Sequence, residues 1–278
     1  MFHFRTIALC LVGFIFTQLA LASENAPTDN KIRIGGTGSA IATMQILAKA
    51  FIKSHPGVII ETVPSLGSGG GIKAMRSGII DLAISGRALK PTERTEGVLA
   101  TEYARTPFVF VVSTHNNASA ITTKELVNIY KGEIRVWPDG KTMRLVLRPE
   151  VESDTDIVKS ISQEMNLAVK SALAREGMIM AITDQDSADN IENIPGAIGT
   201  LTLAQVVSEH RALKPLTLNG LTPSIDAMTE GKYPYFKSMY MVSSAKPNPL
   251  TQAFIAFVRS PAGRKILEEN GQRAMPDK

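Results

Sequence analysis

The sequence predicts an α/β protein built around a mostly parallel sheet. From Lys31 onward, stretches typical of strands alternate with stretches of helical periodicity, and strands joined by helical crossovers pair in parallel. Glycine-rich turns follow some of the expected strands, as at Gly35 to Ser39, and such turns mark the ends of elements. The length of 278 residues corresponds to about two domains. Hydrophobic residues at 44% and charged residues at 20% are typical of a globular protein.

The first part of the chain is expected to contain three strands and two helices. The strands are Lys31 to Ile34, Val58 to Val63 and Ile79 to Ile84. A helix is expected from Ile41 to Phe51, because apolar residues recur there at helical spacing, and Pro56-Gly57 ends it. A second glycine-rich loop, Ser65 to Gly71, is expected to lead into a short helix at Ile72 to Arg76.

The alternation continues through the rest of the chain. Further strands are expected at Phe108 to Ser113, Met143 to Leu147, Ile198 to Leu203, Leu213 to Leu218 and Ser238 to Ser243. Helices are expected at Lys124 to Tyr130, Ile157 to Met165, Ala168 to Arg175 and in a C-terminal segment that carries Phe254, Phe257 and Val258. An apolar stretch, Met178 to Ile182, lies between the third of these helices and the strand that begins at Ile198.

Residues 1–22 have the order of features of a secretory signal peptide. Arg5 supplies a positive charge, an almost wholly apolar run follows, and Ala20-Leu21-Ala22 places small residues where a signal peptidase cleaves. A membrane anchor is the alternative, but the apolar run is short for a span of about 20 residues. We therefore expect cleavage and a mature protein in the periplasm. Cys10 is the only cysteine, so a disulfide framework and cysteine-based zinc sites are excluded.

The enzyme motifs that the sequence suggests at first sight are incomplete. Asp139 to Thr142 is similar to the end of a phosphate-binding P-loop, but Arg135 occupies the position of its first glycine. Ile41 replaces the third glycine of a dinucleotide-binding turn, and Leu66 replaces the first glycine of a nucleophile elbow. We therefore expect no enzyme activity and no cofactor.

Metal and nucleic-acid binding have little support. The histidines His55, His115 and His210 are far apart and have no metal-ligand neighbour at helical spacing. Asp184, Asp186 and Asp189 lack the glycine of a calcium loop, so we expect them at a helix N-terminus instead. A net charge of +4 and an aromatic content of 6% are too low to suggest nucleic-acid binding.

Three loops follow successive strands and are suited to hold an anion. Thr37-Gly38-Ser39 precedes a helix, so its hydroxyls and the unpaired N–H groups of the first helical turn can converge on a negative charge. Ser65 to Gly71 offers close approach of backbone N–H groups and the Ser68 hydroxyl. Ser85-Gly86-Arg87 adds a guanidinium. Because the carboxyl ends of parallel strands form the binding edge of an open α/β sheet, we expect the three loops to lie together.

At this point the sequence resembles the phosphate-binding proteins that serve phosphate ABC transporters. The resemblance is carried in order by Gly36 to Ser39, Leu66 to Ile72, Asp81 to Leu89, Ile129 to Ile134 with Trp137, Gly231 to Tyr235, and Ala253 to Gly263. It covers nearly the whole mature chain. The resemblance implies a two-lobed periplasmic binding protein fold of type II, in which each lobe is a mostly parallel sheet flanked by helices and the ligand cleft lies between the lobes.

The resemblance also implies the lobe boundaries and the ligand contacts. One lobe would comprise residues 28–107 and 223–278, and the other residues 108–222, with crossings near Pro107 and Thr222. The implied ligand-binding residues are Thr37, Gly38, Ser39, Ser68, Gly69, Ser85 and Arg87 in the first lobe and Arg148, Ser153 and Thr155 in the second. Lobe closure would enclose the ligand and present the closed form to an inner-membrane permease.

One stretch departs from the family pattern. Asp154 stands where the family has glycine, four acids crowd Glu150 to Asp156, and Gly86 stands where the family has an acidic acceptor. A carboxylate beside a divalent anion is unfavourable unless it accepts a proton from a protonated ligand oxygen. We hypothesise that Asp154 or Asp156 supplies that acceptor from the other lobe.

The resulting expectation is a monomeric periplasmic solute-binding protein that captures phosphate, or a similar small oxyanion, for an ABC importer. The acidic stretch keeps an alternative open, namely a binding or adaptor protein of the same fold with a degenerate or altered ligand site. Such a protein would act in signalling, adhesion or the extracellular matrix. The expected partners are the oxyanion and the permease, with no nucleic acid and no metal.

Overall fold

The computed structural model describes residues 30–276. The expected signal peptide at residues 1–22 lies outside the described residues. Within residues 30–276, every helix is too short or too polar to cross a membrane.

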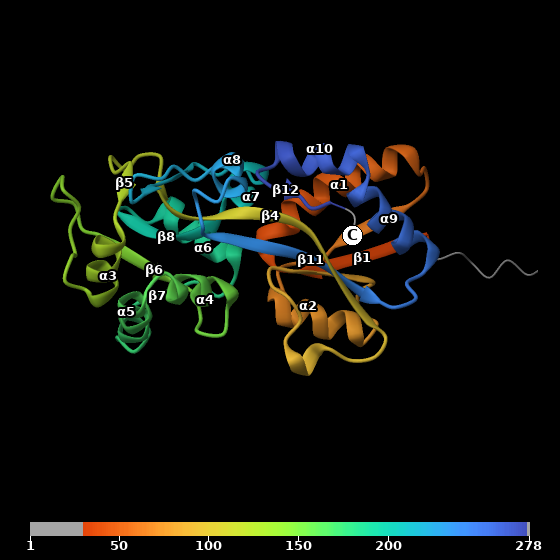
Figure 1. The fold of residues 1–278 in the computed structure, drawn as a ribbon, viewed down its shortest axis with the longest axis horizontal. Helices are drawn as coiled ribbons and strands as arrows, with labels where there is room; N and C mark the ends of the chain where they lie inside the picture. The colour runs from red at the N-terminus through yellow and green to blue at the C-terminus, as the bar shows by residue number, and fades with distance from the viewer. Residues whose placement is uncertain (1–29, 277–278) are drawn as a thin grey trace, which may run out of the picture.

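Two lobes lie side by side and are joined by two long strands (Figure 1). The strands are β4 (Val98–Ser113) and β11 (Phe236–Ser244), which pair antiparallel from Val98 to Pro107. A single mixed sheet runs through both lobes in the order β2-β1-β3-β11-β4-β8-β6-β7. Each outer end of this order is parallel, and the two connecting strands are antiparallel to their neighbours.

The first lobe is built on the N-terminal strands. Its sheet contains β1 (Lys31–Gly36), β2 (Ile59–Thr62), β3 (Leu82–Ser85) and the short β12 (Arg273–Ala274). Its helices are α1 (Ile41–Ser54), α2 (Gly67–Arg76), α9 (Pro249–Arg259) and α10 (Pro261–Glu269), with short 3-10 turns at η1 (Gly38–Ala40) and η2 (Pro91–Glu93). Phe51 of α1 packs edge to face against Phe254 of α9 in its core.

The second lobe is built on the middle of the chain. Its strands are β5 (Ala120–Ile121), β6 (Arg144–Leu147), β7 (Ile179–Met180), β8 (Ala197–Thr202), β9 (Leu213–Pro215) and β10 (Thr217–Leu218). Its helices are α3 (Thr123–Lys131), α4 (Ser153–Ser160), α5 (Gln163–Leu173), α6 (Asp184–Asn193), α7 (Leu203–Ser208) and α8 (Ile225–Thr229). Tyr233 packs into this core after α8, and its hydroxyl donates to the carbonyl oxygen of Phe108 at 2.8 Å.

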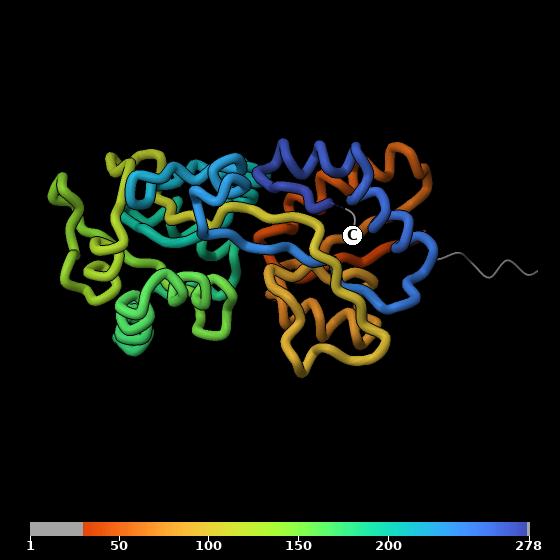
Figure 2. The backbone as a smooth tube through the Cα atoms, in the orientation of Figure 1, coloured from red at the N-terminus to blue at the C-terminus, as the bar shows by residue number. Residues whose placement is uncertain are grey.

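The backbone tube shows the chain passing from one lobe to the other along β4 and returning along β11 (Figure 2). The expected α/β class and the two-lobed arrangement are therefore confirmed. The strand expected at Phe108 to Ser113 is only the second half of β4. The first half was missed because Thr101, Glu102 and Arg105 interrupt its apolar residues.

Two expected loops are the first turns of helices. The loop prediction for Ser65 to Gly71 is wrong, because α2 already begins at Gly67. Its glycines let the helix pack against β1: a Cβ at Gly71 would stand 2.6 Å from the Cα of Gly36. Similarly, the acidic stretch expected as a loop contains the start of α4 at Ser153. Acidic residues are favourable in a first helical turn, which accounts for Asp154 and Asp156.

Candidate functional site

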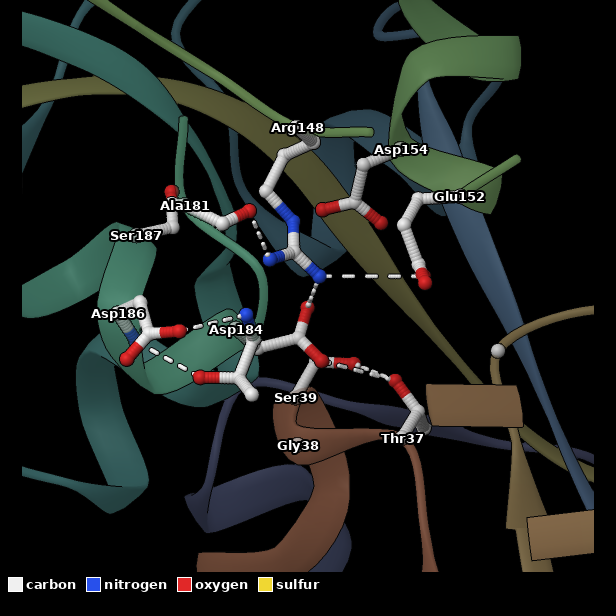
Figure 3. Close-up of polar contacts among 12 residues, drawn as sticks. Thr37, Gly38, Ser39, Arg148, Glu152, Asp154, Ala181, Asp184, Asp186 and Ser187 are labelled. Atoms are coloured by element: carbon white, nitrogen blue, oxygen red, sulfur yellow. Dashed lines mark hydrogen bonds and ion pairs between the residues drawn. The ribbon is translucent and has the colours of Figure 1, made fainter. Parts of the chain in front are cut away.

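The candidate site lies where the two lobes meet, and three elements lead into it (Figure 3). The Thr37-Gly38-Ser39 turn follows β1 in the first lobe. Arg148 follows β6 in the second lobe, and Asp184 opens α6. Contacts between Gly38 and Gln185 hold these elements close, since the Gln185 amide donates to the Gly38 carbonyl oxygen at 3.0 Å. The Thr37 turn and Arg148 thus come together as the sequence predicts.

Arg148 is a buried guanidinium that faces two carboxylates. Only 5% of the residue is exposed. Its Nη1 donates to the carbonyl oxygen of Ala181 at 2.7 Å, which fixes the plane of the group. Its Nη2 lies 3.7 Å from Asp184 Oδ1 and 3.8 Å from Glu152 Oε2. The Nε atom is buried and has no hydrogen-bond partner among the described residues. Arg148 therefore keeps an unused donor in this site.

The Asp184 carboxylate is enclosed between the lobes. The helix beneath it is capped by Thr183, which exchanges hydrogen bonds with Asp186, so Asp184 is held at the first position of α6. From the other lobe, Thr37 Oγ1 donates to Asp184 Oδ2 at 3.2 Å, and the Ser39 N–H also donates to the carboxylate. Thr37 Oγ1 lies 2.9 Å from Ser39 Oγ, so the two hydroxyls form one cluster.

Charge and hydrogen bonds determine the ionisation of Asp184. Burial by itself would raise the pKa of this carboxyl group. Lys237 and Arg148 outweigh that effect together with the Ser39 N–H and the Thr37 hydroxyl, so the pKa of Asp184 lies below its usual range. Asp184 is therefore an anion held by neutral donors and two cations.

Lys237 is the second cation and comes from the connecting strand β11. Its ammonium group forms a buried ion pair with Asp154 and lies 3.8 Å from Asp184 Oδ1. Burial would lower the pKa of Lys237, but the two aspartates raise it above its ordinary value. Gly86 makes room for this side chain, because a Cβ there would stand 2.6 Å from Lys237 Cε.

The second anion loop borders the same cluster through Gly86. The Gly86 N–H donates to Ser68 Oγ at 2.9 Å, and Ser85 Oγ donates to the carbonyl oxygen of Arg87 at 2.6 Å. The Arg87 guanidinium forms a two-pronged ion pair with Glu93, at 2.7 and 2.8 Å, and lies beside Gly69. The Arg87 pair is thus closer than the contacts of Arg148 with Glu152 and Asp184, which lie at 3.8 and 3.7 Å.

Ser153 and Thr155 occupy the first turn of α4. Thr155 Oγ1 donates to the backbone carbonyl oxygens of Arg148 and Pro149, at 3.1 and 2.9 Å. This hydroxyl therefore anchors the start of the helix to the residue that carries the guanidinium. Ser153 is half-buried at the first position of the helix, where its N–H has no partner within the helix.

A small cavity lies beside Arg148 on the side of the second-lobe core, where Val146 and Val158 also line it. The recorded cavity bordered by Arg148, Asp154 and Thr155 has a volume of about 10 Å³, close to the least that holds one water molecule. Within residues 30–276, no group of three His, Cys, Asp or Glu side chains is placed to bind a metal ion.

Sequence reasoning missed Lys237 and the position of Asp184. Asp184, Asp186 and Asp189 do lie in a helix that begins at Asp184, as expected, but its carboxylate also reaches the other lobe. One signal pointed to a cation: Asp154 adds a charge where the family has glycine, and a buried charge needs a partner. That partner is Lys237.

The hypothesis that Asp154 or Asp156 accepts a ligand proton has no support here, because Asp154 pairs with Lys237 and Asp156 is exposed.

Comparisons with known proteins place this geometry in context. The family model described as a PBP superfamily domain matches residues 21–262. The phosphate-binding protein PstS of Borreliella burgdorferi is 26% identical over 95% of this chain and 96% of its own length. Two solved structures share the fold. One is a putative phosphate ABC transporter substrate-binding protein with bound phosphate from Clostridium perfringens, with a TM-score of 0.74 and 19% identity over 88% of this chain and 99% of that one. The other is an ABC-type phosphate transport receptor from Vibrio cholerae, with a TM-score of 0.61 and 21% identity over 88% and 100%.

Proposed function

The chain belongs to the PBP superfamily, and on that premise we propose that it captures phosphate, or a similar small oxyanion, for an ABC importer. The proposal is supported by a relative named as a phosphate-binding protein that matches along nearly its whole length. It is supported also by a structural neighbour that contains bound phosphate. The protein acts by binding and release, without a chemical step.

The observation that carries the proposal is that the site already holds an oxyanion group, the carboxylate of Asp184. Thr37 and the Ser39 N–H donate to it, and Arg148 and Lys237 supply positive charge. Phosphate offers the same kind of acceptor oxygens, and charge-assisted donors bind such oxygens more strongly than neutral donors do. The donors of the site are thus arranged for an oxyanion rather than for an apolar ligand or a cation.

We assign roles to the residues expected from the sequence. Direct contacts are proposed for Thr37, Ser39, Ser68 and Arg148 and for the N–H groups of Gly38, Ser153 and Thr155. Ser85, Gly69 and Arg87 support the second glycine-rich segment, since the Arg87 side chain is bound by Glu93. Lys237 joins this set as a cation that the sequence did not indicate.

The lobes provide the mechanism of capture. The boundaries expected from the sequence are residues 28–107 with 223–278 and residues 108–222. We propose the same two lobes with the return crossing at the start of β11, because Tyr233 packs in the core of the second lobe. Bending of β4 and β11 would open the cleft, and binding to both lobes would favour the closed form. The closed monomer would then dock on an inner-membrane permease from the periplasm. Residues 1–22 have the features of a signal that would direct export to that compartment.

Isothermal titration calorimetry tests the proposal. The protein is unfolded, dialysed and refolded to remove bound ions, then titrated with phosphate and, separately, with sulfate. We expect one phosphate per chain. Arg148→Lys removes the planar fork of donors and weakens phosphate binding by on the order of tenfold or more. Arg144→Lys is the matched control, since Arg144 begins β6, the strand that Arg148 follows, and donates to the Pro195 carbonyl oxygen outside the site. A wild-type protein that binds neither anion contradicts the proposal.

A further inference from the structure

Asp184 is a carboxylate that reaches from one lobe into the anion-binding donors of the other. It belongs to α6 of the second lobe and is 4% exposed. Its partner on the far side is the Thr37 hydroxyl of the first lobe (Figure 3), and the Ser39 N–H of the same turn also favours the ionised carboxylate. Thr37 bonds to Asp184 Oδ2, and the other oxygen, Oδ1, lies 3.7 Å from Arg148 Nη2 and 3.8 Å from Lys237 Nζ. Asp184 thus engages the donors that the proposed function reserves for an external oxyanion.

We propose that the Asp184 carboxylate competes with the oxyanion for the same donors. In the empty protein Asp184 holds the lobes closed. It must leave the site before the oxyanion binds, and this requirement sets the affinity of the protein for the oxyanion. This inference rests on the proposed function for the nature of the competing ligand. The closure it describes is independent of that ligand.

Charge and a shared donor both require the displacement. A phosphate bound to the same donors would bring its charge beside an ionised carboxylate, which is repulsive at low dielectric. Thr37 Oγ1 already donates its one hydrogen to Asp184 Oδ2 at 3.2 Å, so it donates to a ligand only after that bond breaks. Ligand binding therefore requires that Asp184 move away from Thr37 and Ser39.

The contact between the lobes is close enough to hold the empty protein shut. The Gln185 side chain donates to the Gly38 carbonyl oxygen at 3.0 Å, one residue beyond Asp184. A Cβ on Gly38 would overlap Gln185 Oε1 and stand 2.9 Å from Asp184 Cβ. Gly38 has no positive φ, so close approach, rather than backbone strain, is what requires glycine here. The lobes are docked at the point where Asp184 enters the site.

A competitor within the same chain lowers apparent affinity without touching the ligand. If the empty protein has the site open in only about one tenth of molecules, the apparent Kd is raised about tenfold. Asp184→Asn keeps the shape of the side chain but removes its charge. The variant should therefore bind phosphate on the order of tenfold more tightly than the wild-type protein.

The matched control is Asp186→Asn. Asp186 is in the same first turn of α6, but its carboxylate accepts the Thr183 N–H at 2.9 Å and takes no part in the recorded contacts with the first lobe. Phosphate affinity of this control should equal that of the wild type. Equal or weaker binding by Asp184→Asn, with a correctly folded protein by circular dichroism, would overturn the inference.

Small-angle X-ray scattering of phosphate-free protein gives a readout that does not depend on the ligand. The wild type should be compact, and Asp184→Asn should have a larger radius of gyration. Gly38→Ala provides a second route to the open form, because its methyl group separates Gly38 from Gln185 and Asp184. If Asp184→Asn does not fold, the radius of gyration of Gly38→Ala still tests whether this contact holds the lobes closed.

The outcomes separate this inference from the proposed function. If the variants have a larger radius of gyration but neither they nor the wild type bind phosphate, the closing role of Asp184 is supported and phosphate is refuted as the ligand. Phosphate binding by the wild type, with variants as compact as the wild type, keeps the proposed function and refutes the closing role of Asp184.

Discussion

Lys237 of β11 and Asp154 of α4 form an ion pair that is almost completely withdrawn from solvent, with 1% and 3% of the two side chains exposed. The pair links a connecting strand to the second lobe, and Gly86 of the first lobe leaves the space for it. Asp154 stands where the resemblance to phosphate-binding proteins implies a glycine, and Lys237 balances its charge. The pair therefore adds no net charge to the site.

Lys237→Met should destabilise the protein by about 3–5 kcal/mol, because a buried carboxylate that loses its only close cation is left uncompensated. Adding Asp154→Asn should recover part of the loss. Urea unfolding followed by circular dichroism measures both changes in the free energy of unfolding.

The control for this variant is Lys232→Met, which breaks a solvent-exposed pair with Glu230. Exposed pairs contribute little to stability, so the free energy of unfolding should stay essentially unchanged. Equal losses in Lys237→Met and Lys232→Met would show that the buried pair has no special weight.

Asp184 should make the protein sensitive to acid. Its pKa is lowered in the folded state, so its contribution to stability is present above the unfolded-state value of 3.8 and is lost as pH falls through the folded value. The Lys237 pKa is raised, so its contribution is lost only as pH rises above 10.5. Stability should therefore decline below about pH 4.

Unfolding free energies measured by urea titration between pH 2 and 7 test the acid limb. Asp184→Asn should decline less steeply below about pH 4 than the wild type does. If the free energy of unfolding falls equally steeply with pH in Asp184→Asn and in the wild type, the acid sensitivity comes from other carboxyl groups. Glu152 has the opposite effect on the free energy of unfolding. Burial raises the pKa of its carboxyl group, so the ionised form that exists at higher pH is the less favourable one in the folded protein.

Glu152→Gln should strengthen phosphate binding severalfold, because it removes a negative charge 3.8 Å from Arg148 while keeping the shape of the side chain. Glu150→Gln is the control, since Glu150 is exposed and pairs with Lys159. Calorimetry compares the two dissociation constants. A tighter Kd in both variants would indicate a general effect of charge on the surface instead of a local effect at Arg148.

Gly86→Ala should cost about 1–3 kcal/mol of stability, the range for overpacking a filled interior, because its methyl group would meet Lys237 Cε at 2.6 Å. Gly69→Ala tests the opposite case. Its Cβ would contact only Arg87, at 3.6 Å, inside α2, where alanine is favoured over glycine by about 0.5–1 kcal/mol. Thermal unfolding should therefore rank Gly69→Ala above the wild type and Gly86→Ala below it.

The local patterns of the sequence predicted much of the fold. Helical spacing from Ile41 depends on neighbours within a few positions, so the start of α1 was placed correctly. The acids Asp184 and Asp186 do lie in the first turn of a helix, as predicted, whereas Asp189 lies further along it. The family match showed that the chain belongs to the PBP superfamily, and the resemblance to phosphate-binding proteins agrees with the similarity to PstS of Borreliella burgdorferi. The start of α2 was missed because the reason for its glycines, close packing on Gly36, is not local.

The site was predicted in part for the same reason. Thr37, Ser39 and Arg148 follow strands of the central sheet, and the topology of the sheet brings such positions to the meeting point of the lobes. Lys237 lies in the last long strand and meets Asp154, 83 positions away, which no local pattern indicates. Arg87 could be placed in its loop, but its pairing with Glu93 depended on the 3-10 turn η2 that the sequence did not reveal.

We propose that an oxyanion binds between the lobes in the place now taken by the Asp184 carboxylate. A crystal structure of the protein grown with phosphate tests this proposal. We expect phosphate between Arg148 and the Thr37-Gly38-Ser39 turn, with Asp184 moved away from Thr37. Phosphate bound outside this cleft, or an Asp184–Thr37 hydrogen bond that persists at saturating phosphate, would contradict it.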